Sequence, residues 1–184
     1  MIIDKSGKKW YKIGLHIHTS LSDGAVSPED AAKRYKEAGF DAVAFTDHWV
    51  FGEEQVLSDL KILSGCEYNV GGSDTSDCVM HIVGVGMKYK PEITEDMHRQ
   101  QIIDKINEAD GIAILAHPAC CWAINLDRFV NKLVSYGLDG MEVYYPYKRH
   151  RGIIKFHKVK TVEKIADKYG LIKTGGTDLH ETEL

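Results

Sequence analysis

The sequence has few cysteines, and their spacing matches no metal or redox motif. The four cysteines are Cys66, Cys78, Cys120 and Cys121, and no two of them form the C-x-x-C pair of zinc ribbons and dithiol redox centres. We therefore expect reduced thiols in a cytoplasmic protein, and neither a zinc ribbon nor a redox centre.

The sequence also lacks long apolar runs and any large excess of charge. No run is long enough to span a bilayer, and the first residues, MIIDKSGKKW, contain no apolar core of a signal peptide. The formal net charge of -4 argues against attachment to membranes or long nucleic acids through charge alone. We expect neither of them as a partner.

Linkers, repeats and low-complexity segments are absent as well. A chain of 184 residues, 43% of them hydrophobic, is long enough to bury a core and short enough to be one domain. We therefore expect residues 1–184 to fold as a single domain.

Short apolar runs alternate with amphipathic segments along the chain. The runs predict seven strands, at residues 12–18, 41–48, 60–67, 79–86, 111–118, 139–146 and 170–180. The segments between them predict helices at residues 27–40, 94–110, 126–135 and 159–169. For the first helix, Ser27 is a suitable N-cap, Pro28 a suitable first residue and Gly39 a suitable end.

Strands that are joined by helices favour a parallel, buried sheet. The polar, glycine-rich segment between Glu67 and His81 is short for a helical crossover, so the third and fourth strands are expected to form a hairpin. The sequence predicts an α/β fold, namely a distorted seven-stranded (β/α)7 barrel similar to a TIM barrel.

Histidines and carboxylates gather at the ends of the predicted strands. Six of the 9 histidines lie there: His16, His18, His48, His81, His117 and His180. The carboxylates at similar junctions are Asp23, Glu67, Glu142 and Asp178. In a parallel α/β barrel the loops after the strands converge on one face, so these side chains are expected to meet in one pocket.

A single histidine on an apolar strand is more often a core residue than a ligand, but so many imidazoles and carboxylates together require partners or cations. His16 and His18 are two positions apart, so on a strand both would face the same side. Mixed nitrogen and oxygen ligands suit zinc, manganese or iron. Glu142 is either a hydrogen-bond partner of a ligand or a charge at a strand end.

The segments GLHIHTSLSDG, FTDH, GCE, MHIVGVG, LAHP and GGTDLH occur in the order and spacing of the PHP (polymerase and histidinol phosphatase) domain family. The chain resembles that family from Leu15 to His180. The resemblance implies three divalent cations, zinc, manganese or iron, in each chain. His16, His18, Glu67 and Asp178 would hold the first, Glu67 with His81 and His117 the second, and Asp23, His48 and His180 the third.

The resemblance also implies hydrolysis of a phosphate ester in a small phosphorylated metabolite or nucleotide. A metal-activated hydroxide would attack the phosphorus, because cations neutralise the phosphate oxygens and lower the pKa of bound water. Glu67, Asp178 and His180 are the predicted catalytic residues. For Asp178 and His180 the role of metal ligand ranks above that of proton transfer.

A basic segment follows the sixth predicted strand. Lys148, Arg149, His150 and Arg151 are the candidate substrate-binding residues, because the planar guanidinium matches the geometry of a phosphate. The alternative is a solvated basic loop.

Three other functions stay open on the sequence alone. They are a 3′–5′ exonuclease or oligonucleotide hydrolase, an amidohydrolase-like enzyme that cleaves C–N bonds, and a non-catalytic metal-dependent binding module. The chain ends four residues after His180. We therefore expect either an open barrel at this point, or a partner or second copy of the chain that closes it.

Overall fold

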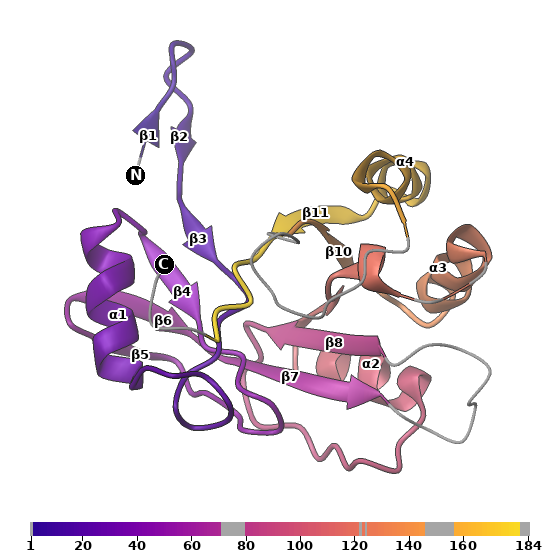
Figure 1. Cartoon of the computed structure of the whole chain (residues 1–184), viewed down its shortest axis with the longest axis horizontal. Coiled ribbons are helices and arrows are strands. Elements are labelled where there is room, and N and C mark those ends of the chain that lie inside the picture. Colours follow the sequence, from indigo (N-terminus) through magenta and orange to yellow (C-terminus); the bar gives the residue numbers. More distant parts are fainter. Residues whose placement is uncertain (1, 71–79, 122, 124, 146–156, 181–184) are drawn as a thin grey trace.

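The computed structural model of the chain describes residues 2–70, 80–121, 123, 125–145 and 157–180. These residues form an α/β fold with two mixed sheets, a separate hairpin and helices on the outside of the sheets (Figure 1). No helix in the described part of the chain is long and apolar enough to cross a membrane.

The smaller sheet has four strands in the order β3-β4-β6-β5. Their bounds are Ile13–Gly14 for β3, Ala42–Ala44 for β4, Leu60–Leu63 for β6 and Gln55–Leu57 for β5. The strands β3, β4 and β6 are parallel, whereas β5 is antiparallel to β6. The hairpin of β1 (Ile2–Ile3) and β2 (Lys9–Trp10) projects from the body of the molecule (Figure 1).

The larger sheet has five strands in the order β11-β10-β9-β8-β7. Their bounds are Ile172–Gly175 for β11, Gly140–Tyr144 for β10, Ile112–Leu115 for β9, Met80–Val85 for β8 and Gly65–Val70 for β7. The strands β9, β10 and β11 are parallel, and β8 is antiparallel to both of its neighbours.

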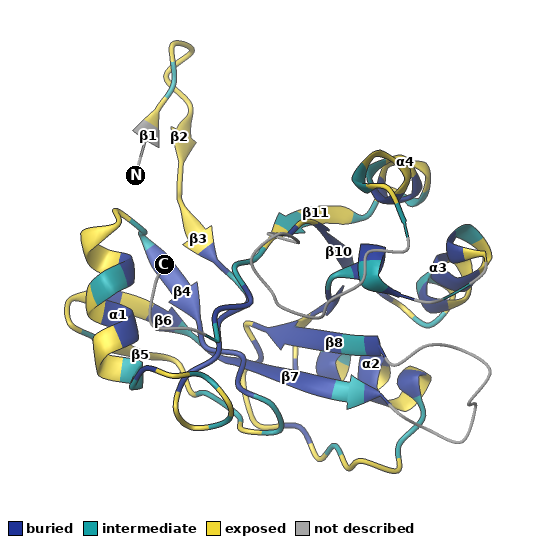
Figure 2. Cartoon of the chain, in the orientation of Figure 1, coloured by how far each residue is buried: buried dark blue, intermediate teal, exposed yellow. Residues whose placement is uncertain are grey.

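Helices cover the outer faces of both sheets. The helix α1 (Pro28–Glu37) contacts β5 and β6, α2 (Arg99–Glu108) contacts β9, and α4 (Val159–Tyr169) contacts β10 and α3 (Leu126–Val134). Their buried sides face the sheets and their exposed sides face outward (Figure 2). This burial forms the apolar core, in which Ile82, Ile106 and Leu115 belong to the largest cluster.

The ends of two helices follow from local chemistry. The hydroxyl of Ser27 accepts a hydrogen bond from the backbone N–H of Asp30 at the start of α1, and Gly39 follows its end with a φ of 76°. Both expectations for this helix are therefore confirmed. The helix predicted at residues 94–110 begins later, because the side chains of His98 and Gln101 form a capping box at the start of α2.

The expected single barrel does not form one continuous sheet in the described residues. The two sheets meet instead at single-residue bridges, where Ile17 pairs with Leu179 and His48 with Glu67 in parallel, and Gly52 pairs with Gly65. We call the first two bridges the sheet junctions.

The strand predicted at residues 60–67 is divided between the two sheets. The chain leaves β6 at Ser64, whose hydroxyl donates to the carbonyl of Met87, and enters β7 at Gly65. A Cβ atom at Gly65 would lie 2.6 Å from the carbonyl oxygen of Phe45, so glycine is needed where the backbones approach. The residues on both sides of Ser64 are mostly apolar, and an apolar pattern alone does not show that the chain passes from one sheet to the other.

The predicted hairpin is confirmed, because β7 and β8 are antiparallel with Glu67 opposite Val83. The hairpin also reverses the strand direction within the larger sheet, because β8 runs antiparallel to β9 as well as to β7. The expectation of reduced thiols is wrong at one position: Cys66 and Cys120 form no disulfide, but Cys121 is disulfide-bonded.

We expect the substitution Ile106→Ala to lower the free energy of unfolding by about 2–5 kcal/mol, because the Ile106 side chain is fully buried between α2 and the sheet. Urea denaturation of the metal-free protein measures this change. The control Ile172→Ala alters a residue that is 50% exposed and should cost at most about 1 kcal/mol. Equal losses in the two variants would contradict the described core.

Candidate metal centre

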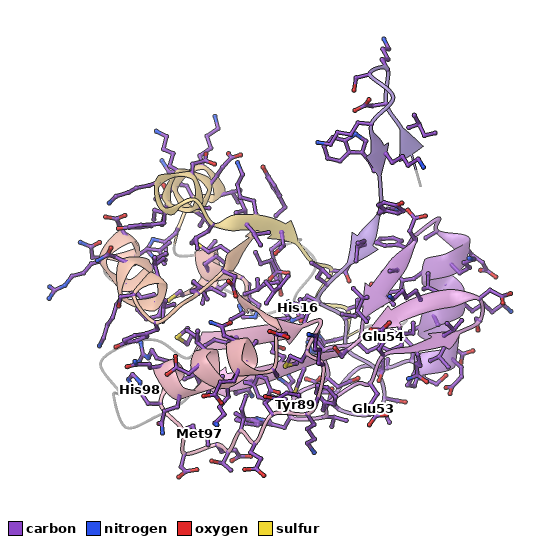
Figure 3. All side chains as sticks on the ribbon, turned by 180° about the vertical axis from the view of Figure 1, so that it is seen from behind. His16, Glu53, Glu54, Tyr89, Met97 and His98 are labelled. Carbon is purple, nitrogen blue, oxygen red and sulfur yellow. The ribbon has the colours of Figure 1, made fainter. Side chains whose placement is uncertain are left out.

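His16 and His18 lie on the segment that follows β3. His16 is in the interior where strands of both sheets meet, whereas Tyr89 and His98 lie toward the outside (Figure 3). Both histidines are buried and their Nε2 atoms face two carboxylates. Glu67 Oε2 is 3.2 Å from His16 Nε2 and 3.0 Å from His18 Nε2, and Asp178 Oδ1 lies at the same two distances. The expectation that the pair shares a face is confirmed.

These spacings suit ligands of a common cation. Ligand atoms about 2.1 Å from an ion are roughly 3.0–3.4 Å apart in octahedral or tetrahedral geometry. Glu67 Oε2 also lies 3.4 Å from His48 Nδ1, yet this buried oxygen makes no hydrogen bond among the described residues. His18 Nδ1 and His48 Nδ1 are buried without a hydrogen bond too. Such atoms are costly without a partner, and a cation fits all three.

A second group lies around the other oxygen of Glu67. Its Oε1 atom is 2.9 Å from His81 Nδ1 and 3.7 Å from His117 Nε2. One ligand atom each of His48, Glu67 and His81 lies within 4.8 Å of the others. The structure thus adds His48 to the predicted group of Glu67, His81 and His117, and the division of ligands among separate cations stays a prediction.

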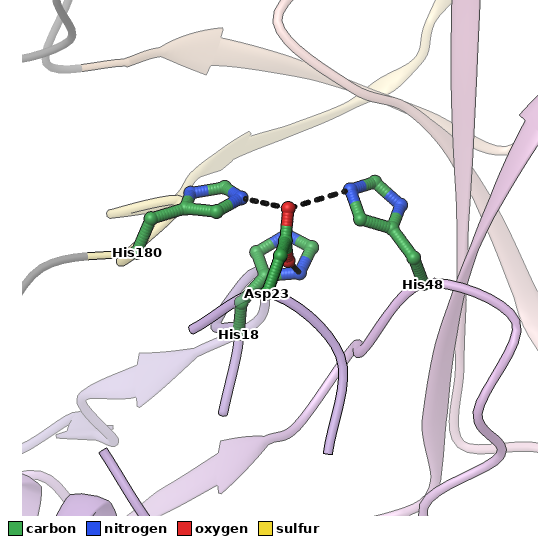
Figure 4. Close-up of side chains that lie close together, drawn as sticks. All are labelled: His18, Asp23, His48 and His180. Carbon is green, nitrogen blue, oxygen red and sulfur yellow. Dashed lines mark ion pairs between the residues drawn. The ribbon is translucent and has the colours of Figure 1, made fainter. Parts of the chain in front are cut away.

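A third group surrounds Asp23 (Figure 4). Its Oδ2 atom is 3.1 Å from His180 Nε2 and 3.7 Å from His48 Nε2, and its Oδ1 atom is 3.3 Å from His18 Nδ1. Because the side chain of Asp23 is 51% exposed, this group lies nearer to solvent than the group of His16, Glu67 and Asp178.

The structure therefore brings all nine predicted ligands together in one cluster, including the predicted catalytic residues Glu67, Asp178 and His180. Their role as metal ligands stays a prediction. The candidate substrate-binding residues Lys148, Arg149, His150 and Arg151 lie outside the described residues.

Charge and burial oppose each other inside the cluster. Burial would lower the pKa of His18, but the charged carboxylates of Asp178 and Glu67, each 3.0 Å from its Nε2 atom, outweigh burial and raise that pKa to about 9. Burial likewise opposes the effect of Glu67, Glu142 and Asp178 on His16, whose pKa is raised well above 6.5. The same contacts, acting against burial, hold the pKa values of Glu67 and Asp178 below their ordinary values.

Two of the predicted ligands have an unusual backbone. His117 has a φ of 29° and Asp178 a φ of 45°, in the left-handed region that non-glycine residues adopt at a cost of about 1–3 kcal/mol. Hydrogen bonds hold both: the His117 N–H donates to Glu142 Oε2 at 2.8 Å, and the Asp178 N–H donates to the His16 carbonyl at 3.0 Å. Such strain is common where a side chain must be aimed at a functional site.

Two supporting residues were not assigned a role from the sequence. The buried carboxylate of Asp47 accepts hydrogen bonds from the backbone and hydroxyl of Thr19 and from the hydroxyl of Ser22, at 2.7–2.8 Å, and so holds the loop that carries Asp23. The hydroxyl of Tyr145 donates to Asp178 Oδ2 at 2.5 Å. The sequence did contain a signal for Asp47: it is an acidic residue in an apolar run, directly before the predicted ligand His48.

A pocket of about 370 Å³ opens onto the cluster. Besides predicted ligands, its lining consists of Met80, Leu115, Ala116, Cys120 and Cys121. No lysine or arginine within the described ranges lines it. The pocket therefore combines a wall of predicted ligands with an apolar wall.

The chain belongs to the PHP domain family, whose sequence profile matches residues 14–172. It is 26% identical over 172 residues to the uncharacterized protein MJ1587 of Methanocaldococcus jannaschii, with 85% of this chain and 95% of that protein covered. The family resemblance inferred from the sequence is thus confirmed.

Solved structures share the fold. A candidate metal-dependent phosphoesterase from Bifidobacterium adolescentis superposes with a TM-score of 0.72 at 17% identity, covering 92% of this chain and 88% of its own. An amidohydrolase from Chromobacterium violaceum, with bound sulfate and no metal, superposes with a TM-score of 0.71 at 18% identity, covering 93% and 88%.

We expect the binding of Zn²⁺ at pH 7 to release protons. With its pKa raised to about 9, the His18 imidazole of the metal-free protein is protonated at neutral pH and must lose a proton before it can bind a cation. The zinc affinity should therefore weaken as the pH falls from 9 toward 6.5. Calorimetric titration in buffers of different ionisation enthalpy measures the release.

The variant His98→Asn is the control for this titration, because His98 lies outside the cluster and asparagine also caps helices. It should release as many protons as the wild type. A binding heat that does not depend on the buffer would contradict the raised pKa.

We expect Asp47→Asn to lower the free energy of unfolding by about 1–3 kcal/mol, since an amide cannot accept all three hydrogen bonds that the carboxylate accepts. It should also weaken cation binding through Asp23. Urea unfolding and metal stoichiometry measure the two effects. In Asp127→Asn, which removes an exposed ion pair with Lys168, both should change little.

Proposed function

We propose that this protein is a metal-dependent phosphoesterase that hydrolyses a small phosphorylated metabolite or nucleotide. The observation that carries the proposal is the buried Glu67 carboxylate, whose Oε2 atom faces nitrogens of His16, His18 and His48 without hydrogen bonding to them. Family membership supports the same reading. Residues 1–184 would act as one hydrolase domain, with the two sheets as walls of a distorted barrel.

The donor set suits three divalent cations of zinc, manganese or iron. Neutral imidazole and carboxylate are ligands for each of these ions, and no thiolate is needed. When bound, such cations neutralise phosphate oxygens and lower the pKa of water. Nitrogen and oxygen atoms of Asp23, Glu67, His81 and the neighbouring ligands are close enough to share them.

The residues around the pocket have separate tasks. The Nδ1 atom of His180 is 2.9 Å from the carbonyl oxygen of Asp178, to which it donates, and Nε2 faces Asp23 Oδ2 at 3.1 Å. With cations bound at the cluster, Nε2 would be the atom of His180 that holds one of them. Asp178, with its lowered pKa, stays ionised and only accepts.

The pocket supports a small substrate. Its volume of about 370 Å³ is typical of small-molecule sites, and its apolar lining offers contact to a compact organic group. Since no cationic side chain of the described chain lines it, neutralisation of the phosphate falls mainly to the cations.

Hydrolysis of a C–N bond is the second candidate. The structural likeness to the amidohydrolase from Chromobacterium violaceum favours it. The same ligand set can polarise a carbonyl oxygen as well as a phosphoryl oxygen.

We expect the protein loaded with manganese, zinc or iron to release phosphate from small phosphate esters, and chelation to abolish the activity. The panel comprises generic monoesters and diesters, histidinol phosphate and a 3′,5′-bisphosphate nucleotide. Asp178→Asn should lower kcat/KM at least about 100-fold, because it replaces a charged, buried group at the centre of the cluster. Phosphate release measures both.

The matched control is Asp167→Asn, which alters an exposed ion pair with Lys173 and should keep full activity. If protein fully loaded with metal releases no phosphate from any ester, the proposal is wrong. Release of ammonia or an amine from amide substrates would then support the second candidate.

A further inference from the structure

The strand β10 supplies none of the nine clustered residues, but Glu142 on this strand and Tyr145 directly after it contact them from behind. Glu142 is 2% exposed, and both of its oxygens lie near His16 Nδ1, at 3.2 and 3.3 Å. Glu142 Oε2 also accepts the backbone N–H of His117 at 2.8 Å. Glu142 lines a separate small cavity rather than the pocket, so it lies on the side of His16 away from the candidate cations.

This contact determines which nitrogen of His16 can bind a cation. A carboxylate only accepts hydrogen bonds, so His16 Nδ1 must be the protonated donor. When His16 loses its other proton to bind a cation, the lone pair is on Nε2, the atom that faces Glu67 and Asp178. Metal-binding histidines are commonly fixed in this way by a carboxylate on the other ring nitrogen.

Gly176 gives independent evidence that the packing is built for this contact. A Cβ atom at position 176 would lie 1.9 Å from Glu142 Oε1 and 2.6 Å from His16 Cβ. Any side chain there would displace the carboxylate or the imidazole. The close approach of Glu142 to His16 therefore depends on glycine at this position.

Tyr145 does for Asp178 what Glu142 does for His16. Its buried hydroxyl donates to Asp178 Oδ2, which leaves Oδ1 to face His16 and His18 at 3.2 and 3.0 Å. Its ring packs edge-on against His117, with centroids 5.4 Å apart. Two predicted ligands are thus each held on the side opposite to the candidate cations.

We infer that Glu142 and Tyr145 are positioning residues, which fix His16 and Asp178 so that Nε2 and Oδ1 are presented to the cation between them. This inference rests on the proposed metal-dependent function. Neither residue touches the substrate, so both act through the ligands that they hold.

The test compares Glu142→Gln and Tyr145→Phe with the matched control Tyr144→Phe. Tyr144 is the neighbouring residue on β10, but its hydroxyl donates to Glu163 on the exposed face of α4. Zinc affinity is measured by competition with a chelator, and circular dichroism reports whether each variant is folded. We expect Glu142→Gln and Tyr145→Phe to lose about 10- to 100-fold in zinc affinity, and Tyr144→Phe to bind like the wild type.

Nitrogen-15 NMR of the zinc-loaded wild type gives a readout that a merely structural role would not move. We expect the proton of His16 on Nδ1 and the metal on Nε2. Metal on Nδ1, or unchanged affinity in folded Glu142→Gln and Tyr145→Phe, would overturn the inference. Should Glu142→Gln fail to fold, the comparison of Tyr145→Phe with Tyr144→Phe and the NMR experiment still test the inference.

The zinc-affinity test of the positioning residues can be distinguished from the phosphate-release test of the proposed function. If the wild type binds zinc but hydrolyses no ester, the proposed function fails while the affinity comparison still tests the positioning residues. If the wild type binds no zinc, manganese or iron, both proposals are wrong.

Discussion

The carboxylate of Glu67 is the constraint on which the rest of the structure depends. It is buried on β7 of the larger sheet, pairs through its backbone with His48, which follows β4 of the smaller sheet, and is in contact with five imidazoles. A negative charge in this position needs positive charge around it. In the metal-free protein protonated histidines provide it, and in the proposed enzyme cations do so. The two forms would therefore differ in the protonation of these histidines.

The sheet junctions and the candidate ligands occupy the same short segments. At the first junction the bridging residue Ile17 lies between His16 and His18, and its partner Leu179 lies between Asp178 and His180. At the second junction the bridging residues His48 and Glu67 are themselves predicted ligands. The ladder of backbone hydrogen bonds is thus sparse where side-chain ligands are dense. Cations bound there would connect the two sheets at the places where backbone pairing is weakest.

Much of this arrangement could be predicted from the sequence, because it depends on local pattern. The N-cap of Ser27, the stop at Gly39 and the hairpin before His81 are short-range features. The nine clustered residues could be found because polar side chains able to bind metals, placed at the ends of apolar runs, are costly unless they meet. The direction of β8 relative to β9 and the change of sheet at Ser64 depend on pairing between distant segments, which apolar pattern does not specify. Tyr145 could not be identified, because a tyrosine after a strand is usually only a packing residue.

The change of sheet at Ser64 has a consequence for the metal-free state. Here the backbone passes directly from β6 into β7, and so it ties the smaller sheet covalently to the strand that carries Glu67. This tether needs neither a cation nor a side-chain contact. Without any cation, Glu67 therefore stays close to His48, and the cation binding proposed above would start from a nearly assembled site. Little ordering entropy then opposes the capture of ions.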